Sequence, residues 1–148
     1  MRWVKAIARV LLGAALTFAG ISHLTFSRLA FQAQVPTWLP LDADFVVLAS
    51  GVVEITLGIW LASGFKTHIA GLLTAAFFIV IFPGNISQYV TQTDAFGLNT
   101  DSARLTRLFF QPLLVLWALW STGAWRWLVL NAFFIGRAKG QPPHQSVP

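Results

Sequence analysis

The 148-residue chain contains no cysteine and little charge. Without cysteine, disulfide bonds, thiol catalysis and thiolate metal sites are excluded. Charged residues make up 10% of the chain, whereas soluble domains carry about 25%. Because a surface with so few charges would aggregate in water, the expected surroundings of this chain are lipid. The sequence also has no phosphate-binding loop, serine triad motif or cluster of metal ligands, so no metal or other cofactor is expected.

Long apolar segments are what the chain has in abundance, since 56% of its residues are hydrophobic. A helix needs about 20 mostly apolar residues to cross the hydrocarbon core of a bilayer. Four segments qualify, at about residues 7–24, 45–64, 68–88 and 105–122. The sequence therefore predicts an all-α membrane protein, a four-transmembrane-helix bundle that forms one domain over residues 1–140, with residues 141–148 as a disordered tail. A signal peptide is the alternative for the first segment, but no convincing cleavage site follows it.

Positive charge is distributed unevenly between the two ends of the predicted helices. Seven cationic residues fall on the side of the N-terminus: Arg2, Lys5, Arg9, Lys66, Arg126, Arg137 and Lys139. Three fall on the other side: Arg28, Arg104 and Arg107. Because cytoplasmic loops are enriched in Lys and Arg, an N-in, C-in topology is predicted, and the net charge of +5 is interpreted as a topology signal without a nucleic-acid partner. His23 and His68 also fall on opposite sides, so a haem with two axial histidines is not expected.

Short helices along the membrane interface are predicted outside the spans. Residues 26–33 place apolar side chains at helical spacing, and Pro36 and Pro40 then prevent the helix from continuing. Residues 124–136 form an amphipathic stretch rich in tryptophan and phenylalanine. Aspartates at the starts of two spans are expected to cap them: Asp42 or Asp44 for the second span and Asp101 for the fourth.

One face of each predicted span carries small or polar side chains. At about 100° per residue, Gly51, Glu54 and Gly58 lie on one narrow stripe of the second span. Glycine on a membrane helix usually marks close contact with another helix, so Glu54 is expected to face other helices and not lipid. The glycines expected to pack the helices together are Gly13, Gly20, Gly51, Gly58 and Gly71.

The inward polar residues gather in the outer half of the predicted bundle. Glu54 lies about nine residues from the outer end of its span, roughly 14 Å deep at 1.5 Å per residue. An ionisable residue at this depth indicates a functional site by default, so a polar pocket that opens to the outside is predicted. The candidate residues for binding a ligand or protons are His23, Glu54, Asn85, Gln88, Arg107 and Gln111. The alternative is structural, with these side chains only locking the helices together through hydrogen bonds.

Two environments are predicted for the Glu54 side chain. In the favoured one, a neutral carboxyl group is hydrogen-bonded to Gln111, to Asn85 or to a backbone carbonyl. Prolines in the third and fourth spans each free the carbonyl four residues earlier, which supplies such an acceptor. In the alternative, Glu54 forms an ion pair with Arg107, which requires the arginine to reach inward.

Five spaced segments of the chain resemble the DoxX family of small bacterial membrane proteins. In chain order they are FAGISHL, VPTWLP, SGVVEITLGIWL, FPGNISQ and RLFFQPLLVLWALW. The resemblance covers roughly residues 10–122 and includes Gly20, His23, Pro36, Pro40, Gly51, Glu54, Gly58, Asn85 and Gln111. It implies a four-helix, multi-pass protein of the bacterial cytoplasmic (inner) membrane. The family is named after a subunit associated with thiosulfate:quinone oxidoreduction; the cysteine-pair chemistry of a neighbouring group cannot apply to a chain without cysteine.

Two functions follow from this resemblance and from the predicted pocket. The favoured one is a non-catalytic accessory or scaffold subunit associated with a membrane redox complex, in contact with the lipid bilayer and with a redox partner protein or a second copy of the chain. The alternative is a binder or transporter of a small lipophilic, quinone-like molecule, or of protons, through the outer-half pocket around Glu54. One carboxylate and one histidine are too few groups to specify a reaction, so the chain is not expected to be an enzyme on its own.

Overall fold

A computed structural model of the chain describes residues 1–95 and 100–139, with side chains up to Phe134. Within these residues the fold is entirely helical, which confirms the predicted all-α class. The helices are α1 (Arg2–Leu24), α2 (Arg28–Gln32), α3 (Ala43–Ser63), α4 (Thr67–Thr91), α5 (Asp101–Thr122) and α6 (Ala124–Lys139). The tail predicted to be disordered, residues 141–148, lies outside the described residues.

The ends of the helices extend beyond the predicted spans where the sequence becomes polar. The largest difference is at α1, which begins at Arg2, because apolar length predicts the width of the hydrocarbon core and not the full helix. The Asp42 side chain caps α3 as predicted, accepting a hydrogen bond of 2.9 Å from the Phe45 amide. The prediction that Asp101 caps the fourth long helix is wrong. Thr100 is the cap, accepting a 3.2 Å bond from the Ala103 amide, and Asp101 lies in the first turn.

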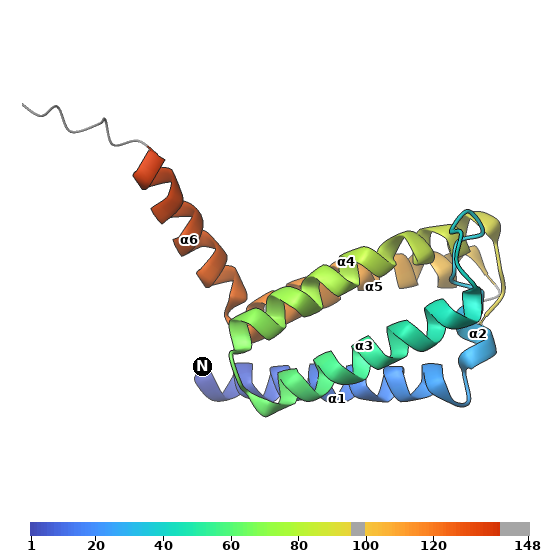
Figure 1. Ribbon diagram of the computed structural model, residues 1–148, viewed down its shortest axis with the longest axis horizontal. Helices are drawn as coiled ribbons and strands as arrows, with labels where there is room; N and C mark the ends of the chain where they lie inside the picture. Colours follow the sequence, from blue (N-terminus) through green and yellow to red (C-terminus); the bar gives the residue numbers. More distant parts are fainter. Residues whose placement is uncertain (96–99, 140–148) are drawn as a thin grey trace, which may run out of the picture.

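The four long helices are arranged as two antiparallel pairs (Figure 1). Helix α1 packs along α3 and α4 packs along α5, while contacts between the two pairs are fewer. An apolar core joins the pairs, built from Leu12, Leu16, Leu57, Leu61, Ala70, Ala75, Phe78 and Ala118. Most of these residues lie in the half of the molecule that contains the N-terminus, so the opposite half is left for polar side chains.

Glycines bring α1 and α3 into backbone contact. A Cβ atom added to Gly20 would lie 2.6 Å from the Gly51 carbonyl oxygen, and one added to Gly13 would lie 2.6 Å from the Gly58 carbonyl oxygen. Both distances are far below van der Waals contact, so only glycine fits at Gly13 and Gly20 with this helix spacing. In the other helix pair, Gly71 of α4 faces the side chain of Thr122 of α5.

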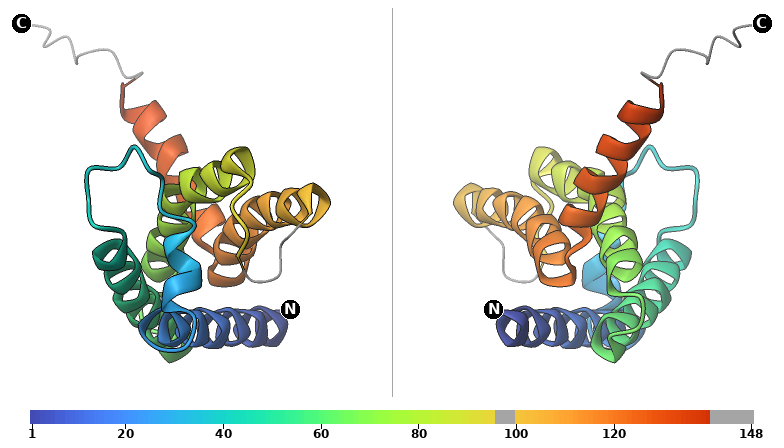
Figure 2. Two further views of the ribbon diagram at one scale, coloured as in Figure 1. Left: turned by 90° about the vertical axis from the view of Figure 1, so that its right-hand side faces the viewer. Right: turned by 90° about the vertical axis from the view of Figure 1, so that its left-hand side faces the viewer.

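Three helices, α1, α3 and α4, are long and apolar enough to cross a membrane. Helix α5 differs from the prediction for residues 105–122, because it reaches the required apolar length only together with α6, and the two helices are bent by 78°. The polar side chains of α5, among them Arg107 and Gln111, reduce its apolar character. Gly123 forms the corner with φ at 74°, a left-handed conformation that favours glycine. Beyond it, α6 points away from the four long helices (Figure 2). These features are consistent with a multi-pass membrane protein.

Candidate functional site

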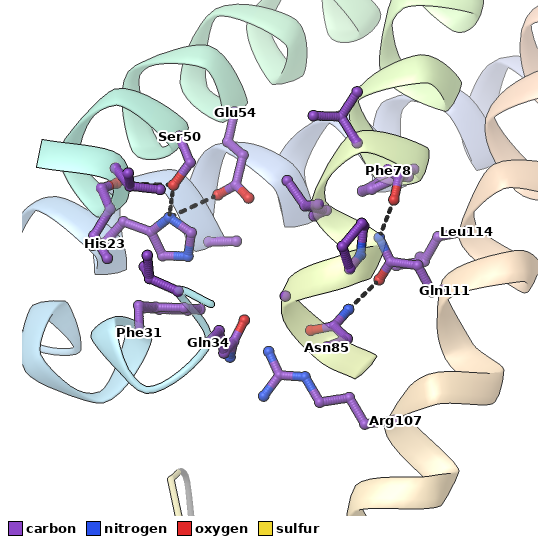
Figure 3. Close-up of a pocket in the computed structure, with 18 of the residues that line it drawn as sticks. His23, Phe31, Gln34, Ser50, Glu54, Phe78, Asn85, Arg107, Gln111 and Leu114 are labelled. Carbon is purple, nitrogen blue, oxygen red and sulfur yellow. Dashed lines mark hydrogen bonds and ion pairs between the residues drawn. The ribbon is translucent and has the colours of Figure 1, made fainter. Parts of the chain in front are cut away.

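A cavity of about 550 Å³ lies between the two helix pairs, in the half of the molecule that contains α2. Its walls come from α1, α3, α4 and α5, and the segment from Gln34 to Leu39 covers one side. This segment reaches α4 because Gly84 leaves room for it: a Cβ atom there would lie 2.5 Å from the Gln34 carbonyl oxygen. Most residues that line the cavity are apolar. The polar side chains among them point toward the middle of the cavity (Figure 3).

His23 and Glu54 form the polar group on the α1 and α3 side of the cavity. The His23 Nδ1 atom lies 3.4 Å from Glu54 Oε2 and 3.1 Å from the Ser50 hydroxyl. Both ionisable side chains are buried, with 6% of His23 and 5% of Glu54 exposed. The ring of Phe31 from α2 packs edge-on against the imidazole. The close contact of α1 and α3 at Gly20 and Gly51 is what places histidine and glutamate side by side.

Asn85 and Gln111 form the second polar group, on the α4 and α5 side. The Asn85 amide donates a 2.9 Å hydrogen bond to Gln111 Oε1, and the Gln111 amide donates a 2.7 Å bond to the Phe78 carbonyl. The carbonyl four residues before Pro83, which the proline was expected to free, is that of Ile79. The carbonyl that accepts is one residue earlier.

The structure corrects the predicted partners of Glu54. Gln111 and Asn85 bond to each other and to Phe78, and the ionisable group that contacts the Glu54 carboxylate is His23. Among the described residues, Glu54 Oε2 has no hydrogen-bond partner, because 3.4 Å exceeds the usual length of such a bond. Helical periodicity gives the direction in which Glu54 points from its own helix. It could not show that α1, and not α5, supplies the ionisable side chain that contacts Glu54.

Of the two remaining residues predicted to form the pocket, Arg107 lines the cavity and Gln88 does not. Arg107 lines the cavity from α5, and its guanidinium group points across the cavity toward Gln34 (Figure 3). Gln88 does not line the cavity, although it is buried. Its amide donates a 3.2 Å hydrogen bond to the Thr93 carbonyl and so fixes the end of α4. Its position on the inward stripe of α4 was predicted, but it lies beyond the polar groups along the helix axis.

Ser50 and Gln34 line the cavity and were not predicted. Ser50 lies four residues before Glu54 and therefore on the same stripe of α3, so helical spacing could have identified it. Gln34 lies in the irregular segment after α2, where no periodicity indicates which way a side chain points. Its amide nitrogen is buried without a hydrogen-bond partner in the described part of the chain.

The arrangement suits binding better than nucleophilic catalysis. In a serine–histidine–carboxylate triad the serine and the carboxylate contact opposite nitrogens of the imidazole. Here Ser50 and Glu54 both approach Nδ1, so the ring cannot pass a proton from the hydroxyl to the carboxylate side. Over residues 1–95 and 100–139, no group of three or more possible metal ligands is found.

Comparison with known proteins gives a family but no function. The chain matches no curated protein and no solved structure. It matches a family described as a domain of unknown function, DUF8561, over residues 12–122. The matched region begins within α1, ends at the last residue of α5 and includes every residue that lines the cavity. With this match over most of its length, the chain belongs to the DUF8561 family.

Proposed function

We propose that this protein is a four-helix membrane protein that binds a small, largely apolar molecule with a polar head group in the cavity between its two helix pairs. The observation that carries the proposal is the cavity itself, about 550 Å³ in volume, with apolar walls and a few convergent polar side chains. Sites for small molecules and cofactors typically have this size and this combination of surfaces. Two open polar atoms, on Glu54 and Gln34, support a bound head group.

The membrane setting belongs to the same proposal. Four spans with an N-in, C-in orientation in a bacterial inner membrane follow from the charge distribution and from the resemblance to the DoxX family. A quinone-like molecule is one member of the proposed ligand class. The accessory-subunit function stays a prediction of the sequence, and we place it second because a packing scaffold has no need for a cavity lined by buried polar groups.

Filling the cavity tests the proposal. Ala15 lines the cavity from α1, and Ala14 beside it is exposed without lining the cavity. The wild type, Ala15→Phe and Ala14→Phe would be purified from native membranes in mild detergent, and organic extracts would be analysed by mass spectrometry. We expect one apolar molecule in near-stoichiometric amount with the wild type and with Ala14→Phe, and its loss with Ala15→Phe.

The same purification distinguishes the two functions. An extract that contains only bulk lipids, together with a co-purifying protein in fixed ratio, would reject the binding proposal in favour of the accessory subunit. Equal amounts of the small molecule in both phenylalanine variants would show that it binds elsewhere. A gel-filtration profile like that of the wild type is required of each variant, so that loss of the ligand is not loss of the fold.

A further inference from the structure

The hydrogen-bonding groups of the cavity divide into engaged and open ones. The amides of Asn85 and Gln111 are engaged, since each donates to an acceptor within the α4 and α5 pair. Glu54 Oε2 on the opposite wall is open: it is buried and has no hydrogen-bond partner among the described residues. A carboxyl group offers an acceptor oxygen whether ionised or neutral. An open buried acceptor destabilises the folded protein unless a ligand or water satisfies it.

The hydroxyl of Ser50 determines which nitrogen of His23 carries the proton. Ser50 has a single hydroxyl proton and donates it to the Val47 carbonyl over 2.9 Å. The 3.1 Å contact between Ser50 Oγ and His23 Nδ1 therefore needs the proton on Nδ1. In the neutral ring, Nε2 is then a bare acceptor. It lies on the side of the ring away from Ser50, and His23 is one of the residues that line the cavity.

From these two acceptors we propose that the cavity selects a hydroxyl-bearing ligand, an uncharged and largely apolar molecule whose O–H group donates to one member of the acceptor pair, His23 Nε2 or Glu54 Oε2. The inference rests on the proposed function and specifies its ligand class. A ketone or an ether of the same shape has no proton to donate. A carboxylate likewise has no proton to donate to either acceptor.

The other polar groups of the cavity fit such a ligand. The open amide nitrogen of Gln34 is a donor, so it can meet the oxygen lone pairs of a hydroxyl or of a second polar group on the ligand. Arg107 is the charged side chain that faces the cavity from α5, and the described lining residues of α2, α4 and the segment 34–39 add no further charge. The rings of Phe31 and Phe78 on the walls suit an aromatic or otherwise flat apolar body.

A matched pair of probes tests the ligand class. We would measure binding of 1-naphthol and of its methyl ether, 1-methoxynaphthalene, to the full chain in lipid nanodiscs by equilibrium dialysis, with empty nanodiscs as the reference for partition into lipid. The probes share the apolar rings and differ in the donated proton. We expect 1-naphthol to bind about tenfold more tightly, the equivalent of one hydrogen bond.

Variants of the acceptor pair assign the preference to its atoms. His23→Phe keeps a ring and removes the acceptor, and Glu54→Leu removes the carboxyl group. The variant that lacks the acceptor in use is expected to reduce the preference for 1-naphthol to about twofold or less while 1-methoxynaphthalene still binds. The double variant His23→Phe/Glu54→Leu is expected to show the same loss whichever acceptor is used. His68→Phe is the control, because His68 lies at the opposite end of the fold, stacked on Trp127, and the preference should stay at the wild-type level. The comparison of probes on the wild type needs no variant, so an unfolded variant leaves the test intact.

The outcomes separate this inference from the proposed function. Equal binding of both probes, or tighter binding of the ether, would overturn the hydroxyl inference and leave the cavity as a binding site. No binding of either probe above empty nanodiscs would overturn the proposed function and the inference with it. A preference for 1-naphthol that survives in the double variant His23→Phe/Glu54→Leu would show that the acceptor pair does not produce it.

Discussion

At the scale of residues, the defining feature is a glutamate in an apolar helix whose polar neighbour comes from another helix. His23 and Glu54 are both buried and 3.4 Å apart, so removing either takes away the ionisable group that the other contacts. We predict that His23→Leu costs about 1–3 kcal/mol of stability, because it also removes the hydrogen bond to Ser50. Glu54→Leu should cost less than His23→Leu, because Glu54 Oε2 has no hydrogen-bond partner among the described residues. The double variant should cost about 1 kcal/mol less than the sum, because the shared contact is lost only once. Thermal unfolding in detergent of the four proteins measures this coupling.

His68, which is distant from Glu54, provides the control for this comparison of single and double variants. His68 and Glu54 lie in different parts of the fold, so His68→Leu and Glu54→Leu should add within about 0.5 kcal/mol. If the costs of His23→Leu and Glu54→Leu are additive as well, the contact between the two side chains does not contribute to stability. The two side chains would then act independently.

At the scale of elements, backbone contact between α1 and α3 positions the histidine beside the glutamate. A Cβ atom on Gly20 would meet the Gly51 carbonyl at 2.6 Å and the Ile55 amide nitrogen at 2.9 Å, and backbone atoms cannot move aside without moving the helix. We predict that Gly20→Ala destabilises the protein by about 1–3 kcal/mol, the usual cost of overpacking. Thermal unfolding in detergent is the measurement.

An exposed position on the same helix controls for the change of side chain alone. Ala14 is exposed on α1, so Ala14→Val should change stability by less than about 0.5 kcal/mol. A Gly20→Ala protein as stable as the wild type would contradict the close approach of the two helices, and the His23–Glu54 distance would lose its structural explanation.

At the scale of the whole molecule, charge separates the two ends of the long helices. The end with the N-terminus carries Arg2, Lys5, Arg9, Lys66 and Arg126 and, within the described residues, no Asp or Glu. At the other end Arg28 pairs with Asp44, and Arg104 pairs with both Asp94 and Asp101. Arg28 and Arg104 at one end are thus neutralised by ion pairs, whereas within the described part of the chain the cations of the other end form none. This difference strengthens the asymmetry on which the N-in, C-in proposal depends.

Reporter fusions test this orientation directly. Fusions at residue 66 and after the last residue should read cytoplasmic, and a fusion near residue 97 should read external. The bend of 78° between α5 and α6 makes the C-terminal fusion the most informative. An external reading there would mean that α5 and α6 do not carry the chain back across the membrane, which would overturn the four-span orientation.

Much of this protein is determined by local sequence. Apolar length predicted the four long helices to within a few residues at most ends, because a helix that crosses lipid must be apolar over a fixed distance. Helical periodicity placed Glu54 on the same stripe as Gly51 and Gly58, and the structure turns that stripe toward α1. The Asp42 cap was also predictable, since a capping side chain and the amide it accepts from are only three residues apart.

Only the tertiary structure decided which inward side chains meet. Periodicity gives the angle at which a residue faces but not the helix that lies opposite, nor how far that helix is shifted along its axis. Glu54 therefore contacts His23 and not Arg107 or Gln111, and Gln88 fixes the end of α4 instead of lining the cavity. The cavity and the position of Gln34 depend on the whole fold, because an irregular segment crosses from one helix pair to the other. These are contacts between residues far apart in the chain, which local sequence patterns do not determine.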